Sequence, residues 1–138
     1  MRTEDLTGHY LDLAVAIALR RLHGDIAIDA VRHGFFNPSI NPAQGEALIR
    51  QEKVWFDLIA SWHAHISLDG INYMCSGPTL LIAAMRCIVL SRIGLEVEFD
   101  QETMGRLMAG DRTAELLRAL KDPSLTPPTF HSERYNTP

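Results

Sequence analysis

The chain has 138 residues, of which 46% are hydrophobic and 22% are charged, a length and composition that suit one globular domain with a packed core. Its net charge of −4 and its lack of a long lysine and arginine run argue against nucleic-acid binding on electrostatic grounds, because such binding depends on neutralised phosphates. The longest apolar stretch, residues 80–90, is interrupted by Arg86 and is far shorter than the roughly 20 residues of a membrane span. No membrane partner is therefore expected.

The first predicted helix covers residues 7–22. Apolar residues recur there at helical spacing, Thr7 is placed to cap the first turn, and Gly24 follows as a left-handed stop. Residues 26–28, Ile-Ala-Ile, predict a short strand, and residues 32–39 predict a loop with two aromatic side chains.

The second predicted helix begins at Asn41 and ends near Glu52. Asn41 can cap it, Pro42 suits the first helical position, and Gln44 stands where a capping box places its second residue. The predicted buried face consists of Ala43, Ala47 and Leu48.

Three segments predict a small sheet. Residues 54–59 are apolar apart from one aspartate, and residues 62–66 alternate apolar side chains with His63 and His65. A turn follows at residues 68–70, and residues 71–75 could form a further short strand or an ordered loop.

The clearest element is an apolar helix over residues 78–93. Pro78 is preset for the first helical position, and a helix that is apolar on nearly every face is typically buried. Arg86 and Arg92 are its only charged residues, and Gly94 follows as its stop.

The remaining sequence predicts an edge strand at residues 95–99, a helix from Asp100 to Met108, and a short helix at residues 113–120. Residues 122–138 contain four prolines and predict an extended or disordered tail. The expected fold is α+β: a small, mostly antiparallel sheet against two or three main helices, in one domain over residues 1–121. Residues 95–99 and the helices after them are expected to join a second copy in a homodimer.

Three blocks of residues resemble the phage NinX-like family and cover roughly the first 100 residues. They are Leu11–Ala16; Asn37-Pro38-Ser39 with Ala43-Gln44-Gly45; and Gly77-Pro78-Thr79 with the segment Leu81–Cys87. The chain departs from the family pattern at Pro42, at Glu46-Ala47 and at Arg50. The resemblance implies a phage or prophage protein that acts in the bacterial host cytoplasm, and it implies no chemistry. Two cysteines outside any C-x-x-C pair, and a first segment without the apolar stretch of a signal peptide, agree with that compartment.

Arg86 is the first candidate functional residue, because a charge within an apolar helix is costly unless it is paired. One hypothesis is an anion site formed by Gly77, Thr79 and Arg86 at the start of the helix, where free backbone amides attract anions. The alternative is a structural ion pair of Arg86 with one of four carboxylates: Asp12, Glu46, Glu52 or Asp57.

A second candidate group consists of Asn37, Ser39 and Gln44. A polar loop that leads into a helix suits ligand recognition, whereas ordinary turn chemistry uses the same residue types. His63 and His65 are weak metal candidates, because a zinc site needs at least three protein ligands. The distant His33 or Asp69 could complete such a site, but no spacing indicates it, and the alternative is a pair of exposed strand histidines.

Three functions follow from these residues. The first is a non-catalytic accessory protein that binds a small anionic ligand such as a nucleotide. The second is an interaction module that docks on a host protein through its C-terminal region. The third is an enzyme with a site around Arg86, Asp12 and the two histidines. The sequence contains no catalytic or cofactor motif, so no cofactor is expected and the first function is preferred.

Overall fold

The computed structural model describes residues 1–20, 22 and 24–107. The chain divides into two units, Met1–Phe99 and a second that starts at Asp100. The first unit contains, in order, the 3-10 helix η1 (Thr3–Asp5), α1 (Gly8–Leu19), α2 (Gly24–Arg32), α3 (Pro42–Glu52), β1 (Trp55–Ile59), β2 (Ser61–Leu68), β3 (Ile71–Gly77) and α4 (Leu80–Arg92).

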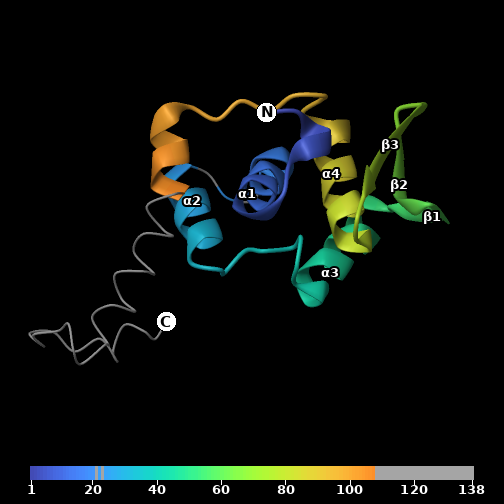
Figure 1. The fold of residues 1–138 in the computed structure, drawn as a ribbon, viewed down its shortest axis with the longest axis horizontal. Helices are drawn as coiled ribbons and strands as arrows, with labels where there is room; N and C mark the ends of the chain where they lie inside the picture. Colours follow the sequence, from blue (N-terminus) through green and yellow to red (C-terminus); the bar gives the residue numbers. More distant parts are fainter. Residues whose placement is uncertain (21, 23, 108–138) are drawn as a thin grey trace, which may run out of the picture. The chain divides into compact units, whose positions relative to one another are not determined.

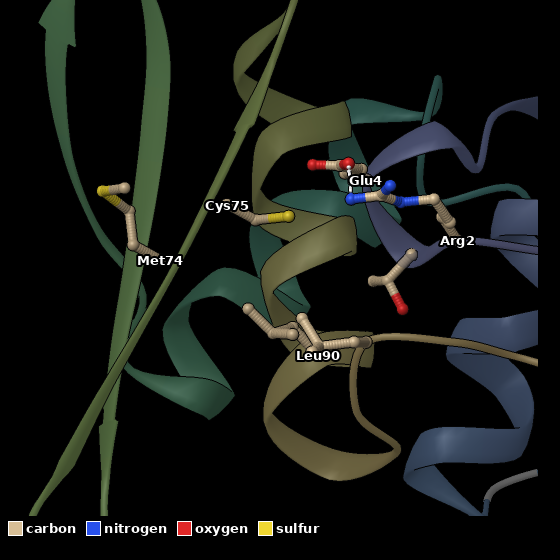
Figure 2. Close-up of a pocket in the computed structure, with 7 residues that line it drawn as sticks. Arg2, Glu4, Met74, Cys75 and Leu90 are labelled. Atoms are coloured by element: carbon tan, nitrogen blue, oxygen red, sulfur yellow. Dashed lines mark ion pairs between the residues drawn. The ribbon is translucent and has the colours of Figure 1, made fainter.

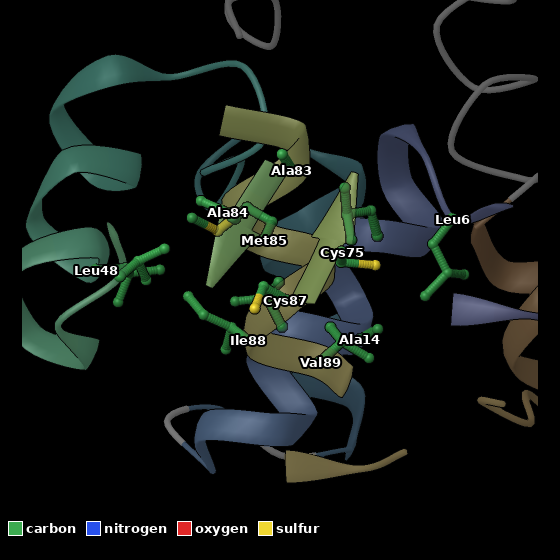
Figure 3. Close-up of a cluster of buried hydrophobic side chains, with 14 of the residues drawn as sticks. Leu6, Ala14, Leu48, Cys75, Ala83, Ala84, Met85, Cys87, Ile88 and Val89 are labelled. Atoms are coloured by element: carbon green, nitrogen blue, oxygen red, sulfur yellow. The ribbon is translucent and has the colours of Figure 1, made fainter. Parts of the chain in front are cut away.

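The apolar helix α4 is the middle layer of this unit. It packs against α1 on one side and against β2 and β3 on the other, while α2 packs on α1 and α3 packs on α4 (Figure 1). Its buried side chains run from Ala83 to Val89, and the apolar ones pack in the hydrophobic core with residues of α1, α3 and the sheet (Figure 3). The predicted α+β fold is therefore confirmed.

The sheet has the strand order β1-β2-β3, and both pairings are antiparallel. Register places Ala64 beside Phe56 and Cys75 on the inner face, which packs against α4. On the outer face, His65 lies between Trp55 and Met74. Residues 71–75, which allowed a strand or a loop, belong to strand β3.

Two predictions in the first third of the chain were wrong. The first helix ends at Leu19, three residues early, because Arg20 takes the left-handed conformation with a φ of 56°. Residues 26–28 lie in helix α2 and form no strand. A run of three apolar residues is too short to distinguish the hydrophobic period of a helix from that of a strand. In the structure the buried residues Ala27, Ile28 and Val31 have helical spacing.

Helix α3 follows its predicted bounds, but its buried face differs. Asn41 accepts hydrogen bonds from the amides of Ala43 and Gln44, as an N-cap does. The predicted buried residues Ala43 and Ala47 are exposed, while Gly45 and Leu48 are buried. Gly45 faces inward, and its lack of a side chain allows α3 to approach Leu81 of α4 closely.

The end of the first unit also differs from prediction. Residues 95–99 form no strand, and only an isolated bridge joins Glu96 to Arg2. The backbone of Met1 and Thr3 bonds to Val97 and Leu95, so this segment is paired within its own chain. It therefore offers no strand edge of the predicted kind to a second copy.

Asp100 caps the helix that follows, as predicted, since its Oδ1 accepts from the Thr103 amide at 2.7 Å. This helix is described over residues 101–107. The predicted helix at 113–120, the tail at 122–138 and the domain boundary between them lie outside the described residues. Among the described helices, none has the length and apolar character needed to cross a membrane.

Gly45 provides a test of the packing between α3 and α4. A Cβ at this position would lie 2.5 Å from Leu81 Cδ2 and 2.7 Å from the Pro38 carbonyl oxygen. We expect Gly45→Ala to lower the free energy of unfolding by about 1–3 kcal/mol, the usual cost of overpacking.

The matched control is Gly105→Ala, at a helical glycine whose added Cβ would meet no atom of the described residues within 4 Å. This variant should be neutral or gain about 0.5–1 kcal/mol from helix propensity. Urea denaturation measures both, and equal stabilities of the two variants would contradict the close packing at Gly45.

Candidate functional site

The first two residues of the predicted anion site connect β3 to α4. Thr79 is the N-cap of α4, because its Oγ1 accepts from the Ile82 amide at 3.1 Å. The helix consequently starts at Leu80, two residues after the predicted start, and Pro78 precedes the cap. Gly77 is required by close packing, since a Cβ there would lie 2.7 Å from the Ala83 backbone nitrogen.

Arg86, the third residue, projects from the middle of α4 and is only 9% exposed. Its Nε donates to the Leu6 carbonyl at 2.9 Å, and its Nη1 donates to the Ser76 carbonyl at 3.0 Å. Among the described residues, no carboxylate oxygen lies within 4.0 Å of the guanidinium. The buried charge is therefore held by backbone dipoles, and the alternative of an ion pair is not realised in the described part of the chain.

The four carboxylates considered for that ion pair are placed elsewhere. Glu52 pairs with Arg92 at 2.5 Å, which ties the ends of α3 and α4 together. Asp57 lies beside the two strand histidines, and Asp12 bonds to the loop before α3. Glu46 is exposed on α3.

A small pocket of about 90 Å³ lies between η1, β3 and α4 (Figure 2). Arg2, Thr3, Glu4 and Cys75 contribute to its walls, and Arg2 forms an ion pair with Glu4. Cys75 points into the space between the strand and the helices, whereas the neighbouring Met74 points away from it. Burial raises the pKa of the Cys75 thiol, and the positive charge of Arg86 opposes this rise. Arg86 thus acts electrostatically on a group that lines this pocket.

Asn37, Ser39 and Gln44 come together at the loop before α3. Gln44 Oε1 accepts from the Asn37 amide at 2.7 Å, and its Nε2 donates to the Phe35 carbonyl at 2.8 Å. The predicted capping box is therefore absent, because the Gln44 side chain reaches the loop and the Asn41 amide donates to the Asn37 carbonyl instead. Gln44 also borders an open groove of about 390 Å³ whose other walls are apolar.

Asp12 lies at the buried end of the same network. Its Oδ1 accepts from the Ser39 amide at 2.9 Å, which joins α1 to the loop. Burial raises the pKa of the Asp12 carboxyl above its ordinary value, and hydrogen bonding to Ser39 opposes this effect in part. Because both residues are buried, no substrate can approach this carboxyl without opening the core.

The outer face of the sheet carries a polar cluster that the sequence interpretation missed. Asp57 lies 3.4 Å from Nδ1 of His63 and 3.0 Å from Nε2 of His65. Trp55 stacks on the His65 ring, with centroids 3.9 Å apart and an interplanar angle of 8°. Strand pairing accounts for the cluster, since Asp57 is opposite His63 and Trp55 is opposite His65. A hairpin register deduced from alternation could have shown it.

The two strand histidines are shielded from solvent to different degrees. His65 is buried beneath Trp55, and His63 is half-buried. Within residues 1–20, 22 and 24–107, no three or more His, Cys, Asp or Glu side chains are arranged to hold a metal ion.

The raised pKa of Asp12 generates a stability prediction. Below the ordinary pKa of 3.8, this carboxyl is protonated in both the folded and the unfolded state. As the pH rises above that value, the unfolded state loses the proton first, so the free energy of unfolding falls until the folded-state pKa is passed.

Asp12→Asn should remove this contribution while its amide oxygen still accepts from Ser39. We expect its stability relative to wild type to be higher at neutral pH than at a pH below 3.8. Urea midpoints measured across this range would test the assignment. Parallel pH profiles for the two proteins would contradict it.

Comparison with known proteins identifies the family. A family model described as bacteriophage P22, NinX matches residues 2–92, a segment that includes every element from η1 to α4. No curated protein matches the chain. Since the family model covers more than half of the chain, the protein belongs to the NinX family of phage proteins.

Proposed function

We propose that this NinX-family protein is a phage or prophage accessory protein of the host cytoplasm that binds a small anionic ligand, such as a nucleotide, without catalysis. The observation that supports the proposal is the buried charge of Arg86. Its guanidinium has five N–H donors, and the described residues provide acceptors for Nε and Nη1 only through two backbone carbonyls. Buried arginines are usually paired with a carboxylate, so this site favours an anion.

The surroundings of Arg86 suit an anionic group. The pocket between η1, β3 and α4 has Arg2 in its wall, paired with Glu4. Arg86 does not line this pocket, but its positive charge acts on Cys75, which does. A volume of about 90 Å³ suits one phosphate or carboxylate group, with the remainder of the ligand outside. In this proposal Gly77 and Thr79 position the start of α4, and Asn37, Ser39 and Gln44 hold the loop before α3.

The separation of the polar residues favours binding over catalysis. Arg86 bonds to Leu6 and Ser76, Asp12 bonds to Ser39, and the two histidines lie beside Asp57 on the outer face of the sheet. An enzyme built on Arg86, Asp12 and His63 or His65 would need these groups to converge on one substrate.

A second candidate function is an interaction module that acts on a host protein, and the outer sheet face, which no described element covers, favours it. Trp55 and Met74 are exposed there beside the histidine cluster, and tryptophan and methionine are enriched at protein interfaces. The C-terminal region first considered for this role lies outside the described residues. A homodimer is also part of the proposal.

Thermal unfolding with inorganic phosphate, nucleotides and cyclic nucleotides tests the ligand proposal. A probe that binds only the folded state at about a hundredfold excess over its Kd adds about 2.7 kcal/mol of stability and raises the Tm. We expect such a rise for wild type, a smaller rise for Arg86→Lys, and none for Arg86→Met.

The matched control is Arg92→Met, which removes the other arginine of α4 and its pairing with Glu52. It should retain the ligand-induced rise. The proposal fails if no probe shifts the wild type, or if folded Arg86→Met responds as the wild type does. Circular dichroism establishes which variants are folded.

A further inference from the structure

We infer that two copies of this chain pair through β1, edge to edge and antiparallel, to make one continuous six-stranded sheet. The inference goes beyond the proposed ligand function and assigns a surface to the proposed homodimer. In this inference β1 forms the dimer contact that was expected of residues 95–99, whose backbone is already paired with residues 1–3.

The edge of β1 is uncovered in the described part of the chain. The strand order β1-β2-β3 leaves β1 with one pairing partner, β2, whereas η1 packs near the opposite edge at β3 (Figure 1). An edge strand carries a row of unpaired backbone donors and acceptors, which natural proteins usually protect with lysine, proline, a bulge or a covering segment. Strand β1, Trp-Phe-Asp-Leu-Ile, has no lysine or proline.

Three apolar side chains of β1 are also unusually exposed to solvent. Trp55 is 50% exposed, Leu58 is 60% exposed and Ile59 is 70% exposed. Trp55 and Ile59 lie on the outer face and Leu58 lies on the inner face. A partner strand at the edge would cover apolar surface on both faces at once, which a ligand on one face would not do.

The strand can pair with itself along its whole length in one register. A twofold axis perpendicular to the sheet keeps the two outer faces on the same side, so outer-face residues must pair with outer-face residues. The register centred on Asp57 satisfies this condition and pairs all five residues. It sets Trp55 opposite the second copy's Ile59, and Phe56 opposite the second copy's Leu58. Aromatic and aliphatic side chains directly opposite each other, with Cβ atoms about 4.5–5.5 Å apart, stabilise antiparallel pairs.

This register brings the two Asp57 residues together at the axis. Like charges at opposite positions destabilise a strand pair. Here each carboxylate lies within 3.0–3.4 Å of ring nitrogens of His63 and His65 from its own β2. These neighbours provide hydrogen bonding and positive charge when protonated, so the polar cluster makes Asp57 tolerable at the axis.

Sedimentation of the full chain over a range of concentrations tests the pairing. Wild type should show a concentration-dependent dimer, and Leu58→Lys should weaken its Kd by about tenfold or more. The control is Ile71→Lys, at an inner-face residue of β3 that is 53% exposed. It should leave the Kd unchanged, because Ile71 lies on the opposite edge strand.

Cysteine crosslinking tests the register. Asp57→Cys places two thiols at the axis, where Cα atoms about 4.5–5.5 Å apart suit a disulfide. Mild oxidation should link this variant into a dimer, while Ser67→Cys, on the outer face of β2, should stay unlinked. The native Cys75 and Cys87 are buried, so wild type should also stay unlinked.

A wild type that is monomeric at every concentration overturns the inference, as do equal effects of Leu58→Lys and Ile71→Lys or an unlinked Asp57→Cys. Failure of the ligand proposal is a separate result. Leu58→Lys leaves Arg86 unchanged, so any Tm rise with an anionic probe should persist in this variant.

Discussion

The hydrogen bonds of Arg86 hold together three segments that are distant in sequence. The guanidinium projects from α4 and bonds to the carbonyl after η1 and to a carbonyl near the end of β3. Because α4 is buried between α1 and the sheet, its only central charge is largely removed from water, which is costly unless the charge is hydrogen-bonded. The chain satisfies this charge in part with backbone dipoles, which position the N-terminal segment and the sheet on the same helix. The pocket with Arg2 and Cys75 is a consequence of that arrangement.

Other polar side chains also join apolar elements. Asp12 connects α1 to the loop before α3, Gln44 holds that loop at two backbone positions, and Glu52 connects α3 to α4 through Arg92. The bond of Asp12 satisfies a carboxyl that would otherwise be costly to bury, and the others fix segments nearer the surface. The polar residues in the blocks that resemble the NinX family therefore have a structural role, whether or not a ligand also uses them.

The two faces and the two edges of the sheet differ in how far other elements cover them. Its inner face is covered by α4, and its β3 edge lies near η1, whereas its outer face and β1 edge have no covering element among the described residues. A side chain on the outer face is stabilised by its neighbours across the strands, as in the stack of Trp55 on His65. Among the described residues, the sheet surfaces available to a partner are therefore its outer face and its β1 edge.

The sequence by itself determined the family, through the blocks of residues that resemble it. It also determined the α+β class, the central apolar helix, the N-cap at Asn41 and the antiparallel strands, because these follow from periodicity and capping within a few residues. The short run at 26–28 and the segment 95–99 were misread, because three to five residues fit a helix, a strand or a paired loop equally well. Only the tertiary structure decided that Gly45 faces α4, that Arg86 bonds to carbonyls, and that Asp57 meets His63 and His65. Such contacts depend on the distance and register between elements, which the local pattern of residues does not contain.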